Sequence, residues 1–175
     1  MVLRPLEMED VEILQGWINN PEIHQYLCRT RPLNRTEEKE WLENLHKQEG
    51  EVVLGIARRE GEQLIGTCGL HGLKGPHRTA ELGILIGEER FHGQGYGTEA
   101  IRLLLAYGFQ TLNLHRVGLR VYENNPRAIR CYEKCGFRRE GVQRESRWWE
   151  GRWWNTLEYA ILEKEWRETK PREIA

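Results

Sequence analysis

The sequence predicts an α/β (α+β) protein with a central mixed sheet and helices on both faces. Alternating strand-like runs and amphipathic helical runs follow one another in the order β-α-α-β-β-β-α-β-α-β-β. A glycine-rich loop joins one of these strands directly to a helix. A chain of 175 residues is one domain by length, so we expect a single domain over 1–175, with 170–175 as a frayed tail.

The first half of the chain supplies five of these elements. An edge strand is followed by an amphipathic helix that stops at an Asn-Asn-Pro turn. The next helix opens at Thr36, which we expect to cap it, with acidic residues in the first turn. Two strands joined by a turn at 59–62 come next. The expected ranges are 2–4, 8–19, a helix from 36, 52–58 and 63–70.

The second half supplies the other six elements. An apolar, β-rich strand precedes the glycine loop, and a helix with apolar residues at helical spacing follows the loop. The next strand alternates apolar and other residues, a short helix follows it, and two long strands meet at Glu150-Gly151. The expected ranges are 79–86, 99–110, 116–121, a short helix from 126, 138–149 and 152–162.

The glycine loop has the composition of a phosphate cradle. Gly93, Gly95 and Gly97 let backbone N–H groups approach an anion closely at the start of a helix. Their G-x-G-x-G spacing differs from the dinucleotide fingerprint, and no acidic residue stands about 20 positions downstream. A P-loop would need Lys immediately before Thr98, where Gly97 stands. Neither standard nucleotide loop therefore fits.

A second motif covers Asn125 to Phe137, with turn formers, a short helix and a stop at Gly136. Together with the glycine loop, it resembles the GNAT superfamily of acetyl-CoA-dependent N-acetyltransferases. The family patterns Gln/Arg-x-x-G-x-G/A and Asn-x-x-Ala-x-x-x-Tyr-x-x-x-Gly-Phe match in the right order, about 30 residues apart. The resemblance covers roughly Leu3 to Trp166 and is nearest to the branch of ribosomal-protein N-terminal and spermidine acetyltransferases.

The resemblance implies the GNAT fold, a mostly antiparallel mixed sheet whose fourth and fifth strands splay apart to admit acetyl-CoA. It also implies a set of cofactor-binding residues along the strand, the loop and the second motif. His92 departs from the family pattern, where Gln or Arg is usual, which affects affinity more than the choice of cofactor. The set is Leu85, Ile86, Gly87, His92, Gly93, Gln94, Gly95, Tyr96, Gly97, Thr98, Asn125 and Arg130. Asn125 also has the position of a helix cap before Pro126.

Two residues are the catalytic candidates. Tyr132 matches the family tyrosine that donates a hydrogen bond to the coenzyme A sulfur; the alternative is an aromatic core residue. Glu81 lies on the strand before the loop, where a family glutamate often takes the proton of the amine or positions it. Its alternative is a sheet carboxylate paired with a nearby arginine such as Arg78.

The expected reaction is direct attack of a primary amine, of a protein N-terminus or a small molecule, on acetyl-CoA in a ternary complex. The alternatives are a non-catalytic acyl-CoA-binding module and a polyamine (spermidine) acetyltransferase. Arg29 and Arg31 stand where the family builds its acceptor pocket and would repel a polycation. The tryptophan pairs 148–149 and 153–154 have three possible roles: a wall of this pocket, a homodimer surface, or ordinary cross-strand packing.

The composition limits the classes of partner that we expect the protein to bind. With 26 basic and 27 acidic residues the net charge is −1, which gives no general attraction to nucleic acid or anionic membranes. No signal peptide or apolar span of about 20 residues is seen, so we expect a cytoplasmic protein. Cys68, His71 and His77 match no zinc spacing, and Cys131 and Cys135 are expected to be packing residues, so no metal site is predicted.

Overall fold

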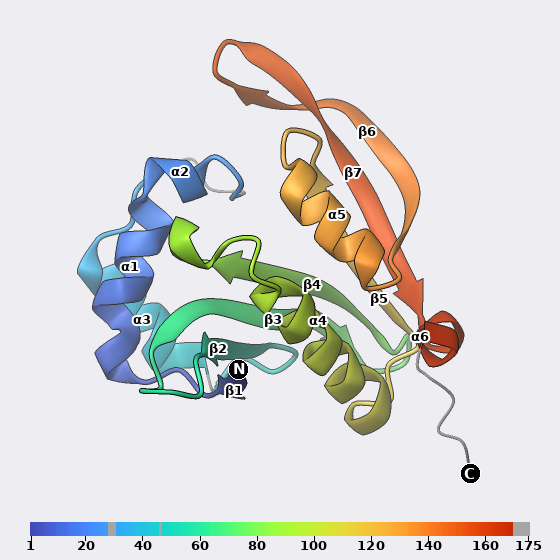
Figure 1. Cartoon of the computed structure of the whole chain (residues 1–175), viewed down its shortest axis with the longest axis horizontal. Coiled ribbons are helices and arrows are strands. Elements are labelled where there is room, and N and C mark those ends of the chain that lie inside the picture. The colour runs from blue at the N-terminus through green and yellow to red at the C-terminus, as the bar shows by residue number, and fades with distance from the viewer. Residues whose placement is uncertain (28–30, 46, 170–175) are drawn as a thin grey trace.

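The computed structural model describes residues 1–27, 31–45 and 47–169 and contains one seven-stranded sheet in the order β1-β2-β3-β4-β5-β7-β6 (Figure 1). Neighbouring strands are antiparallel except for β4 and β5, which are parallel. This confirms the predicted mixed, mostly antiparallel sheet. The strands are β1 (Val2–Arg4), β2 (Val52–Ala57), β3 (Leu64–Lys74), β4 (Thr79–Ile86), β5 (Arg116–Tyr122), β6 (Arg138–Trp149) and β7 (Arg152–Leu162).

Helices cover both faces of this sheet, as predicted. Ile84 and Ile86 of β4 pack against the large core formed with α4, whereas their neighbour Leu85 packs against a smaller cluster with α1 and α2. Because successive strand residues point to opposite faces, these two clusters lie on opposite sides of the sheet. The helices are α1 (Val11–Asn19), α2 (Pro21–His24), α3 (Arg35–Leu45), α4 (Tyr96–Ala106), α5 (Pro126–Lys134) and α6 (Glu163–Thr169).

Several boundaries differ from the sequence predictions. The first predicted helix begins as a 3₁₀ turn at Met8–Asp10, and the short α2 follows it. Thr36 does not cap α3: the side chain of Asn34 accepts from the backbone N–H of Glu37 and the carboxylate of Glu37 accepts from that of Asn34, each at 3.0 Å. The helix after the glycine loop ends in a π turn, Tyr107–Thr111, and α6 was not predicted. The predicted tail, 170–175, lies outside the described residues.

The two parallel strands separate soon after they meet. Pairing between β4 and β5 covers three positions and ends at Glu81 with Gly118. Beyond that point β4 continues to pair with β3, up to Ile86 with Gly66, and β5 continues to pair with β7. The strands therefore form a V that opens from Glu81 onward, which confirms the predicted splay between the fourth and fifth strands.

The β6–β7 hairpin extends beyond the rest of the sheet (Figure 1) and divides its tryptophans between its faces. Trp148 and Trp153 are cross-strand partners, pack edge to face at 5.2 Å between ring centroids, and are exposed. Trp149 and Trp154 are half-buried on the other face, where the Arg152 guanidinium stacks on Trp154. Of the three roles expected for these tryptophans, cross-strand packing is therefore seen at the exposed pair, Trp148 and Trp153.

Candidate active site

A cavity of about 470 Å³ occupies the V between β4 and β5. Its walls come from the end of β4, the glycine loop, the start of α4, the length of α5, and polar residues of β6 and β7. Ten of the twelve predicted cofactor-binding residues line it: Leu85, Ile86, His92, Gly93, Gly95, Tyr96, Gly97, Thr98, Asn125 and Arg130. Two segments more than 25 residues apart in sequence thus meet around one space.

The glycine loop ends at the N-terminus of α4 in the conformation that a phosphate cradle needs. Gly95 is the residue before the helix and has φ +88°, a left-handed conformation that glycine adopts without strain. A Cβ atom there would meet no described atom within 4 Å, so the conformation, not crowding, accounts for the glycine. The first turn of α4 leaves free N–H groups, and its dipole favours an anion there.

His92 fills the corner between the loop and the end of β4. Its Nε2 lies 3.1 Å from the carbonyl oxygen of Ile86, and its Nδ1 contacts the guanidinium of Arg127. Burial lowers the pKa of His92, although the Ile86 carbonyl opposes the shift and Arg127 adds to it. A neutral ring that donates from Nε2 and accepts at Nδ1 satisfies both partners. Arg127 was missed by sequence reasoning, although it stands two residues after Asn125 in the second motif.

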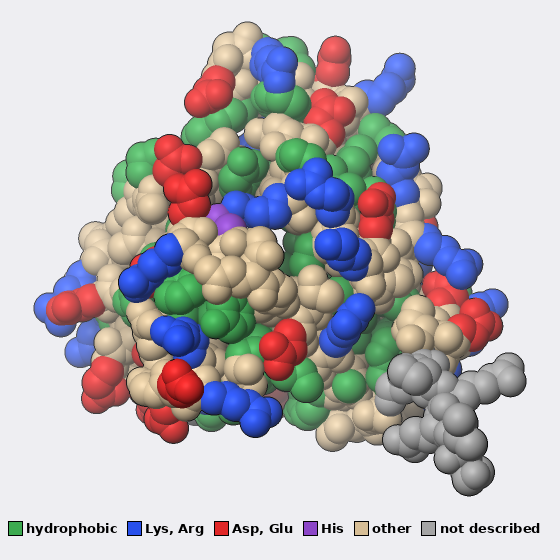
Figure 2. Space-filling view, in the orientation of Figure 1, with side chains coloured by type: hydrophobic (Ala, Val, Ile, Leu, Met, Phe, Trp, Pro, Cys, Tyr) green, Lys and Arg blue, Asp and Glu red, His purple; other side chains and the backbone are tan. Residues whose placement is uncertain are grey.

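The helix α5 forms the opposite wall and is basic. The Asn125 side chain caps it, accepting from the backbone N–H of Ala128 at 3.1 Å, and Pro126 is its first residue. Lys and Arg side chains gather over α5 on the face shown in Figure 2; those that line the cavity are Arg127, Arg130 and Lys134. Coenzyme A carries several phosphate groups, so a basic wall opposite a helix N-terminus suits it.

The two helices that flank the V touch through a pair of thiols. The Sγ atom of Cys131 lies 3.3 Å from the hydroxyl of Thr98, and the thiol of Cys135 donates to the backbone oxygen of Thr98 at 3.7 Å. The pKa of Cys131 is lowered, first by the neighbouring Cys135 side chain and then by the Thr98 hydroxyl. This contact joins α4, which follows β4, to α5, which follows β5.

Tyr132 lies at the inner side of α5 and lines the cavity, with only 7% of its surface exposed. Its ring packs edge to face against Phe137 at 6.0 Å, so both predicted alternatives, a core ring and a polar group at the cavity, are compatible with this placement. Burial raises the pKa of Tyr132, which keeps the hydroxyl protonated and able to donate.

Two predicted cofactor residues, Gly87 and Gln94, are not among the lining residues. A Cβ atom at Gly87 would lie 2.0 Å from the indole of Trp17, so close packing of α1 against the end of β4 explains this glycine. The side-chain amide of Gln94 donates to the backbone oxygen of Arg90 and closes the loop on itself.

Glu81 lies at the apex of the V, outside the main cavity. It lines a second, open hollow of about 570 Å³, which shares Arg120 and Gln143 with the main cavity. Its carboxylate pairs with Arg120, at 2.9 Å from Nε and 3.4 Å from a terminal nitrogen. The expected alternative partner, Arg78, instead donates to Asn113. Sequence reasoning missed Arg120, although strand alternation places it on the same face as Gly118, the partner of Glu81.

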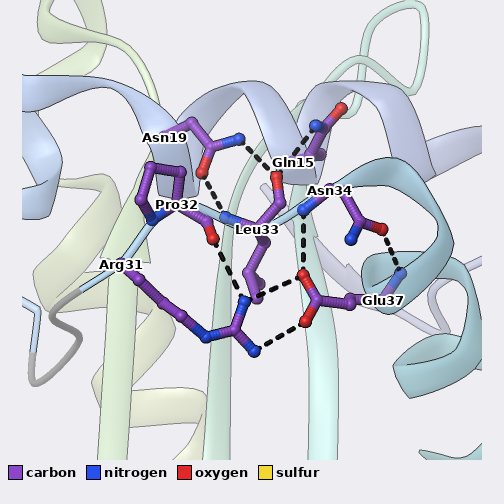
Figure 3. A network of polar contacts seen from close by, with 7 residues as sticks. All are labelled: Gln15, Asn19, Arg31, Pro32, Leu33, Asn34 and Glu37. Atoms are coloured by element: carbon purple, nitrogen blue, oxygen red, sulfur yellow. Dashed lines mark hydrogen bonds and ion pairs between the residues drawn. The ribbon is translucent and has the colours of Figure 1, made fainter.

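Figure 3 shows the surroundings of Arg31, which the sequence analysis expected at the acceptor pocket. Leu33 is anchored by Asn19, whose side chain accepts from its N–H at 2.8 Å and donates to its carbonyl at 2.7 Å. Arg31 forms a two-point pair with Glu37 and is not among the residues that line either hollow. Its charge is thus compensated outside the cavity, while Arg29 lies outside the described residues. Tyr26 and Leu27, at the start of the segment expected to build the acceptor pocket, line the cavity together with Glu22.

No group of three or more metal-ligating side chains is found in the described residues. Cys68 is buried in the core beside α4, and His71, three positions along β3, points to the opposite face.

Within the part of the chain that the structure describes, no helix has the length and apolar character to cross a membrane.

Comparisons with known proteins agree with this geometry. The family model described as Acetyltransferase (GNAT) domain matches residues 1–138. The uncharacterized N-acetyltransferase YoaA of Bacillus subtilis is 31% identical, over 99% of this chain and 95% of its own length. The spermidine N(1)-acetyltransferase of Vibrio cholerae is 34% identical, over 81% of this chain and 80% of its own.

A crystal structure of the spermidine N-acetyltransferase from Vibrio cholerae in complex with CoA and spermine matches the fold with a TM-score of 0.86. The identity is 30%, and the match covers 95% of this chain and 97% of that one. Both motifs, the splayed strands and these relatives lead to the same conclusion: the chain belongs to the GNAT acetyltransferase family and is an N-acetyltransferase that uses acetyl-CoA.

Proposed function

We propose that this acetyltransferase works as one catalytic domain that acetylates a primary amine, on a small molecule or a peptide N-terminus, by direct attack within a ternary complex. The observation that carries the proposal is the extent of the cavity. Its lining includes the glycine loop and the basic wall of α5, and also Tyr26, Gln143 and Thr156 from other elements. Both substrates can therefore occupy it together, as direct transfer requires.

The cofactor end is assigned to acetyl-CoA. The backbone N–H groups of the glycine loop and the basic side chains of α5 would hold the phosphates. The exposed edge of β4 beyond Glu81 offers backbone groups to the amide-bearing arm of the cofactor. In this assignment Gly87 and Gln94 support the loop and the strand end, and the residues that line the cavity contact the cofactor.

Tyr132 is assigned to the leaving group. Attack of a neutral amine on the thioester carbon forms the C–N bond, and collapse of the intermediate breaks the C–S bond and leaves the sulfur as a thiolate. Because burial raises the pKa of Tyr132, complete proton transfer from its hydroxyl to the thiolate is uphill. The hydroxyl therefore stabilises the developing charge as a hydrogen-bond donor.

Glu81 is assigned a positioning role. Both of its oxygens already face the Arg120 guanidinium, which stabilises the ionised carboxylate. An ion pair at the apex of the V, beside the hollow that opens on the acceptor side, can orient an ammonium or amine nitrogen while Arg120 keeps the carboxylate in place.

A polyamine is the second candidate acceptor, because the relatives include spermidine acetyltransferases. The charges of the cavity favour a single amine: Glu22 is the one acidic side chain that lines it within the described residues. A polycation would be better held by several carboxylates. Thiol release from acetyl-CoA, measured with unblocked peptides, amino sugars and spermidine, tests the proposal; no release with any amine would contradict it, and fastest turnover of spermidine would select the second candidate.

A further inference from the structure

We propose that His71, oriented by Glu51, is the general base that takes the proton from the acceptor amine; this inference rests on the proposed function. The reaction needs a neutral amine, whereas an alkylamine is almost entirely protonated at neutral pH. Histidine is the side chain that most often serves as a general base. Neither residue belongs to the two motifs on which the family assignment depends.

The two side chains form a carboxylate–imidazole dyad. The Nδ1 atom of His71 contacts one carboxylate oxygen of Glu51, and the other oxygen accepts from the backbone N–H of Gly72 at 3.3 Å. A carboxylate only accepts hydrogen bonds, so Nδ1 carries the hydrogen of a neutral ring and Nε2 carries the lone pair. The carboxylate thus fixes both the tautomer and the orientation, and it stabilises the imidazolium that forms.

The register of the sheet places this lone pair at the apex of the V. His71 pairs with Glu81 across β3 and β4, so both side chains lie on the same face, and Gly69 pairs with Gly83 beside them. A Cβ atom at either glycine would lie 3.0 Å from Nε2 of His71. The ring therefore lies over backbone that carries no side chains, and Gly83 is only two residues beyond the last pairing of β4 with β5.

The surroundings allow the proton to arrive and to leave. His71 lines the open hollow that joins the main cavity at Arg120 and Gln143, and 42% of its side chain is exposed. Glu51, before β2, contacts the ring directly. The charged groups that line the hollow come from the neighbouring strands: Glu81 on β4, Arg116 and Arg120 on β5, Glu140 on β6 and Glu158 on β7. Both arginines are paired, Arg116 with Glu140 and Arg120 with Glu81, so neither is an uncompensated charge opposing an imidazolium.

The proposed step is balanced. The ammonium of the acceptor gives one proton to Nε2 of His71, and the amine keeps the electron pair of the broken N–H bond. That pair then forms the C–N bond to the acetyl carbon, the C–S bond breaks, and the second proton that the nitrogen loses goes to the coenzyme A thiolate. The imidazolium, held by Glu51, passes its proton to water in the open hollow, which restores the neutral ring.

The test compares His71→Gln and Glu51→Gln with the wild type in steady-state thiol release from acetyl-CoA over a range of pH. The acceptor is whichever of an unblocked peptide or spermidine the wild type acetylates. For His71→Gln we expect a 10²–10⁴-fold loss of kcat/KM at neutral pH that shrinks as pH rises and the amine deprotonates unaided. For Glu51→Gln we expect a smaller loss of kcat/KM, because the ring keeps its Nε2 lone pair but loses the carboxylate that orients it.

His77→Gln is the matched control, because His77 is exposed in the turn between β3 and β4 and lines neither hollow. The increase in melting temperature on adding acetyl-CoA reports folding and cofactor binding for each variant and should match the wild type. Full activity of His71→Gln in an active wild-type background would overturn the inference alone. A pH-independent loss accompanied by a lower melting temperature would also overturn it, in favour of a structural role. A wild type inactive with every amine would instead overturn the proposed function, and the inference with it.

Discussion

The two ends of the cavity are built in different ways. The end that we assign to the cofactor comes from two short contiguous segments, 92–98 and 125–134, and includes backbone groups and helix ends. The end that we assign to the acceptor comes from side chains on separate elements, such as Tyr26, Arg120 and Thr156. Recognition by backbone leaves a local glycine pattern in the sequence, whereas recognition by side chains across a sheet depends on register. The difference explains why a chain can reveal its cofactor more readily than its acceptor.

The largest effect is expected at the backbone-built end. Gly95→Val places a branched side chain at a left-handed position inside the cradle, so it should abolish the thermal stabilisation by acetyl-CoA. At about 100 times Kd that stabilisation is worth about 2.7 kcal/mol. Gly61→Val is the control, because Gly61 has φ +71° in the β2–β3 turn, far from the cradle. An undiminished shift in a folded Gly95→Val protein would show that the loop does not hold the phosphates.

The second-largest effect is expected at Tyr132, and it tests whether α5 contributes to both ends of the cavity. Tyr132→Phe keeps the buried ring and removes only its hydroxyl, so kcat should fall by about 10²-fold while affinity for acetyl-CoA is retained. Because the pKa of Tyr132 is raised, the loss should stay constant from pH 6 to about pH 9, where the hydroxyl remains protonated. Steady-state kinetics across that range provide the measurement. An unchanged kcat would mean that Tyr132 has only a packing role.

A smaller effect is expected at the side-chain-built end. Glu81→Gln removes the charge that pairs with Arg120, so KM for the acceptor should rise about 10-fold, as expected for loss of a charged hydrogen bond, with a smaller change in kcat. Glu163→Gln breaks the ion pair with Arg167 on α6, whose residues line neither hollow, and is the control. If kcat alone falls, and recovers at high pH, Glu81 is the proton acceptor and not a positioning residue.

The smallest effect concerns His92, which joins the strand to the loop. Its pKa is lowered from 6.5, so the folded state favours the neutral ring, and stability present above pH 6.5 is lost as pH falls through the folded-state value. His92→Gln keeps a donor for the Ile86 carbonyl and should remove this part of the acid dependence. Urea unfolding at several pH values measures it; identical slopes for the two proteins would contradict the assignment.

Most of the fold could be predicted from sequence because strand alternation and helix periodicity are local. Two misses have physical reasons: Asn34, not Thr36, caps α3, and the short α6 has little helical periodicity in its seven residues. The residues of the candidate site that lie within the two sequence motifs could be predicted. Arg120 was missed because its role depends on which strand lies beside β4. The packing of Trp17 against Gly87 was missed because it depends on how α1 lies against the sheet.

The contact of Thr98 with Cys131 and Cys135 bears on how the molecule deforms. It links the portion of the chain that ends in α4 to the portion that begins with β5, across the open side of the V. Thiols are weak hydrogen-bonding groups, whereas the strand pairings at the apex are backbone ladders. Any widening of the V would therefore break the contact between Thr98 and the two cysteines before it broke the strand pairing at the apex.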